Sequence, residues 1–232
     1  MELQRNWLDV TYEEKDDAKE AGARWDHSAR RWFAPPGREE ALRRWAAAPD
    51  IPALLPGEDR TLGDGLFVDL VPRSCWFTNV RTCVAPEDWQ RLRRMITTRA
   101  GQRCEICGAT QDASIPRWLE GHERWTYDEE RGVQTLRRLI CLCTACHHVT
   151  HFGFAQVTGR EEEAFAHLMA VTGMSQAAAR AHIDEAFAVW EDRSNRSYDL
   201  DLSMLTGAGV TLAVPPDAEE RAAASEDGLR GM

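Results

Sequence analysis

The sequence predicts an α+β fold with a small N-terminal domain and a larger central module, and three observations support this prediction. Two C-x-x-C pairs, Cys104/Cys107 and Cys143/Cys146, bracket a stretch with the apolar–polar alternation of a β-hairpin. Segments with helical apolar periodicity flank that stretch on both sides. The first 48 residues carry their own short pattern of strands and helices, and a proline-rich segment separates them from the rest.

The composition indicates a soluble protein. A chain of 232 residues can form one ordinary domain with a substantial core and a second, small one. No stretch is apolar over the roughly 20 residues that a membrane span needs, and the polar N-terminus lacks the apolar run of a secretory signal. We therefore expect a cytoplasmic protein with no membrane contact.

The first domain is expected over residues 1–48. Residues 7–12 alternate as a strand does, residues 13–21 have a helical pattern ended by Gly22, and residues 23–34 read as a hairpin. A second helix is expected from Pro35-Pro36 to Trp45.

Several short motifs in this domain resemble a family of unknown function. They are Glu14-Lys15-Asp16, Ala18-Lys19, Gly22-Ala23-Arg24-Trp25-Asp26 and Arg31-Trp32-Phe33. The family is a small domain often appended to primase- and relaxase-type DNA-processing proteins, so the resemblance implies a nucleic-acid context by association. Its tryptophans are expected to pack in the core, with base stacking by Trp25 or Trp32 as the alternative.

Residues 49–60 are expected to be a proline-rich linker, and residues 61–205 the larger domain. Within that domain we expect strands over 66–71 and 75–84, a helix over 86–100, helices over 160–171 and 175–193, and a short strand at 200–202. The last two helices either complete the core or form a homodimer interface. Residues 206–232 have the composition of a mobile acidic tail.

The two C-x-x-C pairs are predicted to bind one structural zinc ion. Each pair places two thiolates on one side of a tight turn, and two pairs complete a tetrahedral shell. Four thiolates leave no open coordination position, so this ion is not catalytic. The ligands are Cys104, Cys107, Cys143 and Cys146, whereas Cys75, Cys83 and Cys141 are expected to be small buried apolar residues.

The long gap between the pairs leaves room for a hairpin. Residues 119–125 form its first strand, residues 128–132 a polar turn and residues 133–136 the start of the return strand. A helix is expected over 143–152. It places His147 and His151 one turn apart on the same face.

Residues 103–153 resemble the HNH nuclease family, in which a ββα-metal fold lies between two zinc knuckles. The matching motifs are Arg103-Cys104-x-x-Cys107-Gly108, Leu119-Glu120-x-His122, Leu139-Ile140-x-Leu142-Cys143 and Cys146-His147-x-x-x-His151. The resemblance implies a phosphodiester hydrolase in which one divalent ion, Mg²⁺ or another, contacts the scissile phosphate while a general base activates water. It places His122 and His151 as the ligands of that ion.

Two positions depart from the family pattern. Glu123 stands where the general base is usually a histidine; it can act as the base or as a third metal ligand. Arg138 stands at the position of the asparagine that orients the base, and it could pair with Glu123 or with phosphate. In an alternative register, His122 is itself the base and Glu120 or Asp128 helps to hold the metal. His147 is expected to pack near the zinc as a structural residue.

The sequence therefore supports two hypotheses. In the first, the chain is a metal-dependent DNA endonuclease whose arginines contact phosphate. In the second, it is a zinc-bearing module without catalytic activity that binds nucleic acid or a protein partner. An ion pair of Glu123 with Arg138 that fills the metal site would favour the second hypothesis. The arginines expected to contact nucleic acid are Arg91, Arg94, Arg99, Arg103 and Arg138.

Overall fold

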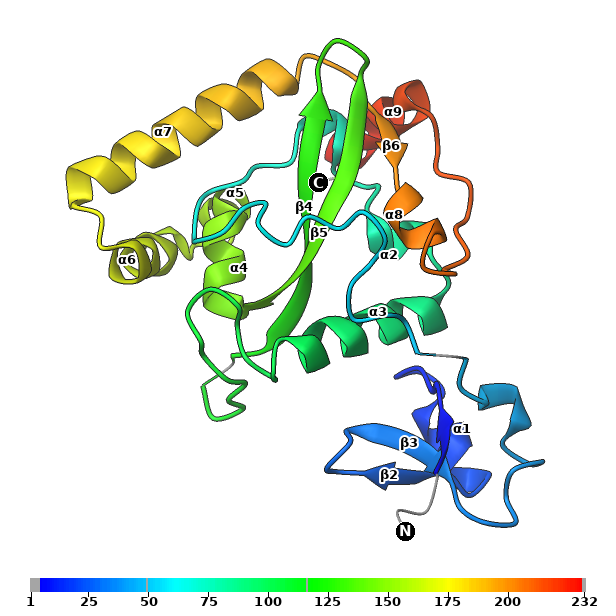
Figure 1. The fold of residues 1–232 in the computed structure, drawn as a ribbon. Coiled ribbons are helices and arrows are strands. Elements are labelled where there is room, and N and C mark those ends of the chain that lie inside the picture. Colours follow the sequence, from blue (N-terminus) through cyan, green and yellow to red (C-terminus); the bar gives the residue numbers. More distant parts are fainter. Residues whose placement is uncertain (1–4, 49, 116, 231–232) are drawn as a thin grey trace.

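The structure is a computed structural model that describes residues 5–48, 50–115 and 117–230. In this part of the chain it is a mixed α+β fold with two three-stranded sheets (Figure 1). One sheet belongs to the N-terminal unit. The other lies at the centre of the larger unit, with helices on both sides of it. The α+β prediction agrees with this arrangement.

The N-terminal unit has its own sheet and its own core. Its sheet has the order β1 (Asn6–Leu8), β3 (Arg31–Ala34), β2 (Arg24–Asp26), all antiparallel, and helix α1 (Lys15–Glu20) lies between β1 and β2 in the chain. The helix expected after Pro35-Pro36 is absent from the described residues; turns lead instead to one short 3₁₀ helix, η1 (Arg43–Trp45). The buried core residues are Leu8, Ala18, Ala23, Ala34, Leu42 and Trp45.

The hairpin predicted between the C-x-x-C pairs is confirmed. Strand β4 (Leu119–Asp128) pairs antiparallel with β5 (Val133–Cys143), and β6 (Asp199–Asp201) joins β5 in parallel. Helix α3 (Pro86–Arg99), also as predicted, packs against the hairpin. A Cβ at Gly121 would lie 3.1 Å from Ile96 Cδ1, so glycine allows this close approach of helix and strand.

Four helices follow the hairpin directly. They are α4 (Thr144–Thr150), α5 (Phe152–Val157), α6 (Glu161–Thr172) and α7 (Gln176–Arg193), and Figure 1 shows them on one side of the β4–β5 hairpin. The predicted helices at 143–152, 160–171 and 175–193 are therefore present. Ser175 is the N-cap of α7 and accepts a hydrogen bond from the N–H of Ala178 at 3.2 Å.

Residues 50–84 differ most from the sequence prediction. The strands expected at 66–71 and 75–84 are absent; the described structure there is loop, a 3₁₀ helix η2 (Arg73–Cys75) and a short helix α2 (Val80–Cys83). The described residues of this loop make isolated backbone hydrogen bonds to the rest of the unit and no strand ladder. In one of them the Asp69 N–H donates to Thr150 O at 2.9 Å. The segment 49–60, expected to be a linker, buries Ile51 and Leu55 in the main core.

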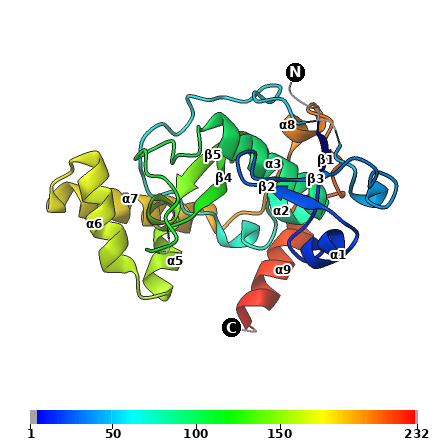
Figure 2. The same cartoon turned by 90° about the horizontal axis from the view of Figure 1, so that it is seen from below.

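The stretch 206–232, expected to be a mobile acidic tail, contains a helix instead, α9 (Ala218–Arg230), and the short helix α8 (Ser203–Thr206) ends where that stretch begins. Figure 2 shows α9 lying apart from the helices α5–α7. Arg221 explains why this stretch is attached. Its guanidinium is fully buried and donates to Gln134 Oε1 at 2.6 Å and to the backbone oxygen of Tyr198. A single buried cation therefore joins α9 to β5.

We expect Arg221→Ala to lower the free energy of unfolding by about 3 kcal/mol, because it removes charge-assisted hydrogen bonds from a buried site. Urea denaturation followed by circular dichroism measures this change. Arg196→Ala is the matched control, since the Arg196 side chain is 44% exposed. An equal, small effect of both changes would contradict the anchoring role of Arg221.

Within the described residues, no helix combines the length and the apolar character needed to cross a membrane.

Candidate metal centres

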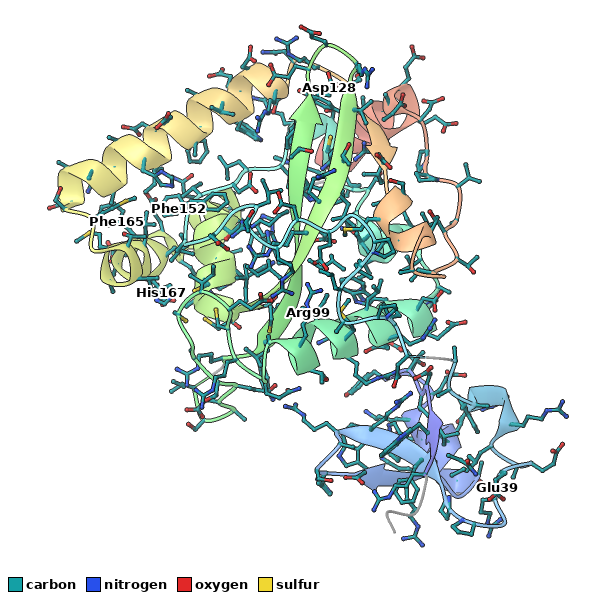
Figure 3. All side chains as sticks on the ribbon, viewed as in Figure 1. Glu39, Arg99, Asp128, Phe152, Phe165 and His167 are labelled. Carbon is teal, nitrogen blue, oxygen red and sulfur yellow. The ribbon has the colours of Figure 1, made fainter. Side chains whose placement is uncertain are left out.

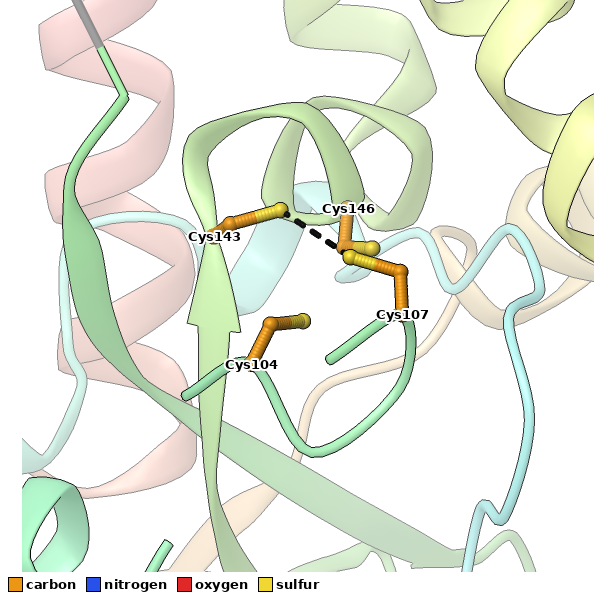
Figure 4. A group of neighbouring side chains, drawn as sticks. All are labelled: Cys104, Cys107, Cys143 and Cys146. Atoms are coloured by element: carbon orange, nitrogen blue, oxygen red, sulfur yellow. Dashed lines mark hydrogen bonds between the residues drawn. The ribbon is translucent and has the colours of Figure 1, made fainter. Parts of the chain in front are cut away.

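Four cysteine sulfurs converge at the base of the hairpin (Figure 4). Cys104 and Cys107 come from the turn after α3, Cys143 ends β5, and Cys146 lies in the first turn of α4. All four sulfurs lie within 4.8 Å of one another. Gly108 follows the first pair with φ of +73°, a left-handed conformation that glycine adopts without strain and that lets the turn close. The four cysteines predicted from the sequence are thus brought together.

This cluster is compatible with a structural metal ion such as zinc. It offers four sulfur ligands, the set that tetrahedral structural zinc sites use, and its residues are mostly buried. His167 of α6 adds a contact that the sequence did not predict, with Nε2 at 3.2 Å from Cys146 Sγ. Glu105 accepts a hydrogen bond from the Cys141 N–H at 2.9 Å and so ties the first knuckle to β5. These contacts orient the sulfurs before any ion binds.

A second cluster consists of three histidines, and it joins the hairpin to the helix after it. His122 lies in β4, His147 lies in α4, and His151 is the next residue after α4. Ring centroids are 4.9 Å apart for His122–His151, 4.7 Å for His147–His151 and 5.3 Å for His122–His147. One ligating atom from each lies within 4.8 Å of the others. The structure therefore brings His122 and His151 together, as the resemblance implied.

His147 is the residue that the sequence analysis placed wrongly. It was expected to pack beside the zinc, yet it contributes to the three-histidine cluster. The signal was present in the sequence: residues four apart share a helix face, so His147 and His151 point to the same side. The Nδ1 atom of His147 lies 3.4 Å from Glu120 Oε2. A carboxylate beside Nδ1 fixes the orientation of the imidazole and leaves Nε2 as the nitrogen that can bind a metal ion.

The environment keeps these imidazoles neutral. Burial lowers the pKa of His122 well below its ordinary value, and the charges of the neighbouring His151, His147 and Arg124 lower it further. Burial, with His147 and Arg124, lowers the pKa of His151 to about 3. Both ring nitrogens of His122 are buried without a hydrogen-bond partner. A buried polar atom without a partner is costly, and a bound metal ion is one partner that would satisfy it.

Glu123 does not join the histidines. Successive side chains of a strand point to opposite faces, so Glu123 lies on the face of β4 opposite His122. There a backbone hydrogen bond from Val80, the first residue of α2, reaches its carboxylate. The side chain at the expected base position therefore points away from the three histidines. Asp128, the alternative metal ligand, is the last residue of β4, at the tip of the hairpin (Figure 3).

Arg138 pairs with two acids, and neither is Glu123. It donates to Asp64 Oδ1 at 2.8 Å and to Glu105 Oε2 at 3.3 Å, and its side chain is nearly fully buried. The ion pair that would have filled the metal site is thus absent from the described contacts of Arg138. Its guanidinium instead connects the 62–64 loop to the first cysteine knuckle.

Three more of the arginines expected to contact nucleic acid make ion pairs inside the protein. Arg99 forms two bonds to the buried Glu58, at 2.7 and 2.8 Å (Figure 3 labels Arg99 on α3). Arg94 donates to Asp9 Oδ1 at 2.9 Å, and Arg91 is buried against Asp88. These side chains hold the fold together. Arg103 differs, because it is exposed and donates only to the nearby Gly108 O at 3.2 Å.

Arg124 is a candidate functional residue that sequence reasoning missed. It lies on the same face of β4 as His122, two residues further along, and 1% of its surface is exposed. Among the described residues none of its three guanidinium nitrogens has a hydrogen-bond partner, and Asp69 Oδ2 lies 3.7 Å from Arg124 Nη1. The guanidinium stacks over Phe67 at 4.2 Å. The signal in the sequence was its alternation with His122, which placed a cation beside the histidines.

Comparisons with known proteins concern only part of the chain. Residues 5–47 match the family model described as "Domain of unknown function (DUF5710)". Two curated proteins from Escherichia coli, both described as "DNA primase TraC", are similar to this chain, with 41% identity over 54 residues and 43% over 44 residues. These matches cover 23% and 18% of this chain. The chain spans about 4% of the length of each primase.

The N-terminal resemblance to a domain appended to primase-type proteins is confirmed by these matches. No solved structure matches the chain. The two metal clusters lie outside residues 5–47, so what they can do has to be argued from their own geometry.

The donor set of the second cluster bears on which ion it would take. Three neutral imidazoles suit zinc and the other first-row transition ions, whereas Mg²⁺ prefers oxygen ligands and keeps several waters. The family resemblance implied Mg²⁺ or another divalent ion, held by the two histidines His122 and His151. With His147 in the cluster, the three nitrogen ligands favour a transition ion.

We predict that the free energy of unfolding depends on pH through the buried carboxyl of Glu123. Burial raises the pKa of its carboxyl from 4.5 to about 7, while backbone N–H groups lower it in part. Between these two values the folded protein binds more protons than the unfolded chain, so the free energy of unfolding falls as the pH rises through this window. Glu123→Gln removes that loss, and we expect it to be more stable than wild type by about 1–3 kcal/mol near pH 8.

Urea denaturation near pH 5 and near pH 8 measures this difference. Glu120→Gln is the matched control, since Glu120 is half-exposed on the opposite face of the same strand. A loss of stability for Glu123→Gln at the higher pH would contradict the prediction.

Proposed function

We propose that this chain is a metal-dependent DNA endonuclease of the HNH type, which hydrolyses phosphodiester bonds at the three-histidine cluster. One observation carries the proposal. A β-hairpin and the helix directly after it bring one ligating nitrogen from each of three imidazoles within 4.8 Å, and both nitrogens of the buried His122 lack a partner among the described residues. A ββα unit with metal ligands on the first strand and on the helix is the arrangement that the family resemblance implies.

In this proposal His122, His147 and His151 hold one divalent transition ion. A bound ion of this kind stabilises the charge that develops on the phosphoryl oxygens and on the leaving 3′ oxygen. Glu120 orients His147 through the 3.4 Å contact with Nδ1. The four cysteines hold the zinc that fixes the helix against the hairpin, and that zinc takes no part in the reaction.

Arg124 supplies a positive charge on the phosphate side. Its guanidinium has unused donors beside the histidines, and an arginine binds a phosphate group through two parallel hydrogen bonds. Since the 63–69 loop covers it, with a Cβ at Gly63 lying 3.1 Å from Arg124 Nε, the loop must move for a phosphate to enter. Glu120 is the half-exposed carboxylate nearest the cluster and is the candidate that would accept the proton of the attacking water.

The DNA substrate is supported by association. The matched curated proteins are described as DNA primases, and the similarity is to a small part of them. A nuclease module joined to such a domain would act on the same kind of polymer.

The test is cleavage of supercoiled plasmid with Zn²⁺, Mn²⁺, Ni²⁺ or Mg²⁺ added, comparing wild type with His122→Ala and His151→Ala. All three proteins are first shown to retain the cysteine-bound zinc. Ion-dependent nicking or cutting that both changes abolish supports the nuclease. An inactive wild type with every ion, on both supercoiled and single-stranded DNA, contradicts it.

The second candidate function is a zinc-bearing module without catalytic activity that binds nucleic acid or a protein. The orientation of Glu123 favours it, because the usual base position of the family is directed away from the histidines. Divalent-ion binding at the histidines without cleavage would be the result that this function predicts. The plasmid experiment therefore separates the two.

A further inference from the structure

A groove of about 480 Å³ lies between the N-terminal unit and helix α3. We call it the interdomain groove. One wall comes from β1, β3 and the turn between β2 and β3, and the other from α3, as the closeness of these elements in Figure 1 indicates. Arg30 spans the two walls and donates to Gln102 Oε1 and Gln111 Oε1, each at 3.3 Å. The walls of this groove are far apart in the chain, so the sequence did not predict that they meet.

The interdomain groove is positively charged although the protein carries a net charge of −10. Five basic residues and one acid line it. That acid, Asp9, is 5% exposed and already pairs with Arg31 and Arg94. In the described part of the chain Arg30 and Arg93, which also line the groove, make no ion pair with a carboxylate, and the fifth cation, Lys15, lies over the Tyr12 ring. The groove therefore has free positive charge for an anionic ligand.

Aromatic side chains line the same groove. Tyr12 is 73% exposed and Trp25 is 40% exposed, and Trp32 packs edge-on against Trp25 with ring centroids 5.3 Å apart. Lys15 Nζ lies over the Tyr12 ring, 3.4 Å from its centroid, so Trp25 is the aromatic side chain with an open face. An open aromatic face beside unpaired cations is a feature on which an unpaired base stacks while phosphates meet the charges. Duplex DNA does not fit this chemistry, because its bases are stacked on each other and do not expose their faces.

We propose that the interdomain groove binds a single nucleic-acid strand, with a base stacked on Trp25 and phosphates on Arg30 and Arg93. The proposal goes beyond the nuclease function, since binding needs no metal in the histidine cluster. It also gives the N-terminal unit a role. Leu119, which lines the groove, lies three residues before His122, or about 10 Å along an extended strand. A strand held in the groove is thus close to the proposed site.

Arg30 allows an unusually clean test. Its φ is +50°, a left-handed conformation that glycine adopts more readily than arginine. Arg30→Gly therefore removes the guanidinium without straining the turn, so a loss of binding would not reflect a loss of folding. Arg93→Ala and Trp25→Ala remove the other two contacts. Arg43→Ala is the matched control, because Arg43 is 79% exposed in the same unit and lies outside the groove.

The experiment uses the full chain without added divalent ion and measures fluorescence anisotropy with a dye-labelled oligothymidine of about 16 nucleotides. The same length of oligouridine and a duplex are the comparison ligands. We expect Kd to rise about tenfold for Trp25→Ala and for each arginine change, and to stay unchanged for Arg43→Ala. Each arginine change should also reduce the slope of log Kd against log salt by about 0.7, whereas Trp25→Ala should leave the slope unchanged.

Equal affinity of wild type, Arg30→Gly, Arg93→Ala and Trp25→Ala for the single strands would overturn the proposal, as would tighter binding of the duplex. Binding of oligothymidine or oligouridine that is tighter than binding of the duplex, and that these three changes weaken, would support it. Comparing the two single strands shows whether the protein prefers deoxyribose or ribose. Failure here is distinct from failure of the nuclease function. His122→Ala should lose cleavage and retain this binding, whereas Arg30→Gly should weaken binding and retain the metal.

Discussion

His147→Ala is expected to lower the affinity of the proposed histidine metal site by at least about 100-fold and to reduce the proposed DNA cleavage by roughly three orders of magnitude. The cysteine-bound zinc should stay in place. This is the largest effect that we predict on activity, and it falls on a residue that was expected to be structural and to pack near the zinc.

The reason is the geometry of the cluster. His147 is the ring closest to His151, with centroids 4.7 Å apart, and it is the only one of the three with a carboxylate, Glu120, within 4 Å of a ring nitrogen among the described ion pairs. Its removal leaves two imidazoles. Two nitrogen ligands bind a divalent ion far more weakly than three, so the ion would be lost at ordinary concentrations.

The adjacent His148→Ala is the matched control. His148 is on the same helix, is half-buried, and lies outside the cluster with its ring 6.4 Å from Phe154. Isothermal titration with Mn²⁺ or Ni²⁺ measures the affinity, elemental analysis measures the retained zinc, and plasmid nicking measures activity. If His147→Ala binds the added ion as wild type does, His147 is not a ligand and the three-histidine assignment is wrong.

The sequence was informative where ligand chemistry and local periodicity decide the structure. The C-x-x-C spacing and the alternation of β4 brought four cysteines to one point and His122 toward the helix, as expected. The error at His147 came from assigning it a structural role near the zinc, next to the ligand Cys146. Its i,i+4 relation to His151 already placed both rings on one face.

The sequence was least informative where contacts between residues far apart in the chain determine the local structure. Nothing local to residues 66–84 reveals that their backbone would bond to α4 and α7 instead of to a neighbouring strand, as when Val68 N–H donates to His182 Nε2 at 3.0 Å. Arg221 was hidden for the same reason. An arginine in an acidic stretch reads as exposed, and only the fold supplies the buried acceptors that hold it.

The direction of each side chain on β4 also needed the structure. Glu123 follows His122 directly and seemed suited to act beside it, but strand alternation sends the two to opposite faces. Arg124, one residue further, returns to the face of the histidines. The alternation rule predicts both placements only if the strand is regular here, and the structure shows regular pairing from Leu119 to Arg124.

Cys104→Ala is expected to abolish zinc binding and to unfold the central unit. Structural zinc in small domains contributes an apparent binding free energy of about 10–16 kcal/mol, which is as large as the whole stability of a typical domain. In this chain the cluster joins the turn after α3, the end of β5 and the start of α4, so three elements lose their common anchor at once.

Cys141→Ala separates this effect from the ordinary cost of truncating a buried side chain. Cys141 is as buried as the ligands but lies outside the cluster, so its truncation should cost only about 1–2 kcal/mol. Elemental analysis gives the zinc content, and urea denaturation followed by circular dichroism gives the stability. Because the histidines are positioned by the same hairpin and helix, loss of the cysteine-bound zinc should also remove the second metal site. A Cys104→Ala protein that keeps its fold and still binds an ion at the histidines would show that the zinc does not position them.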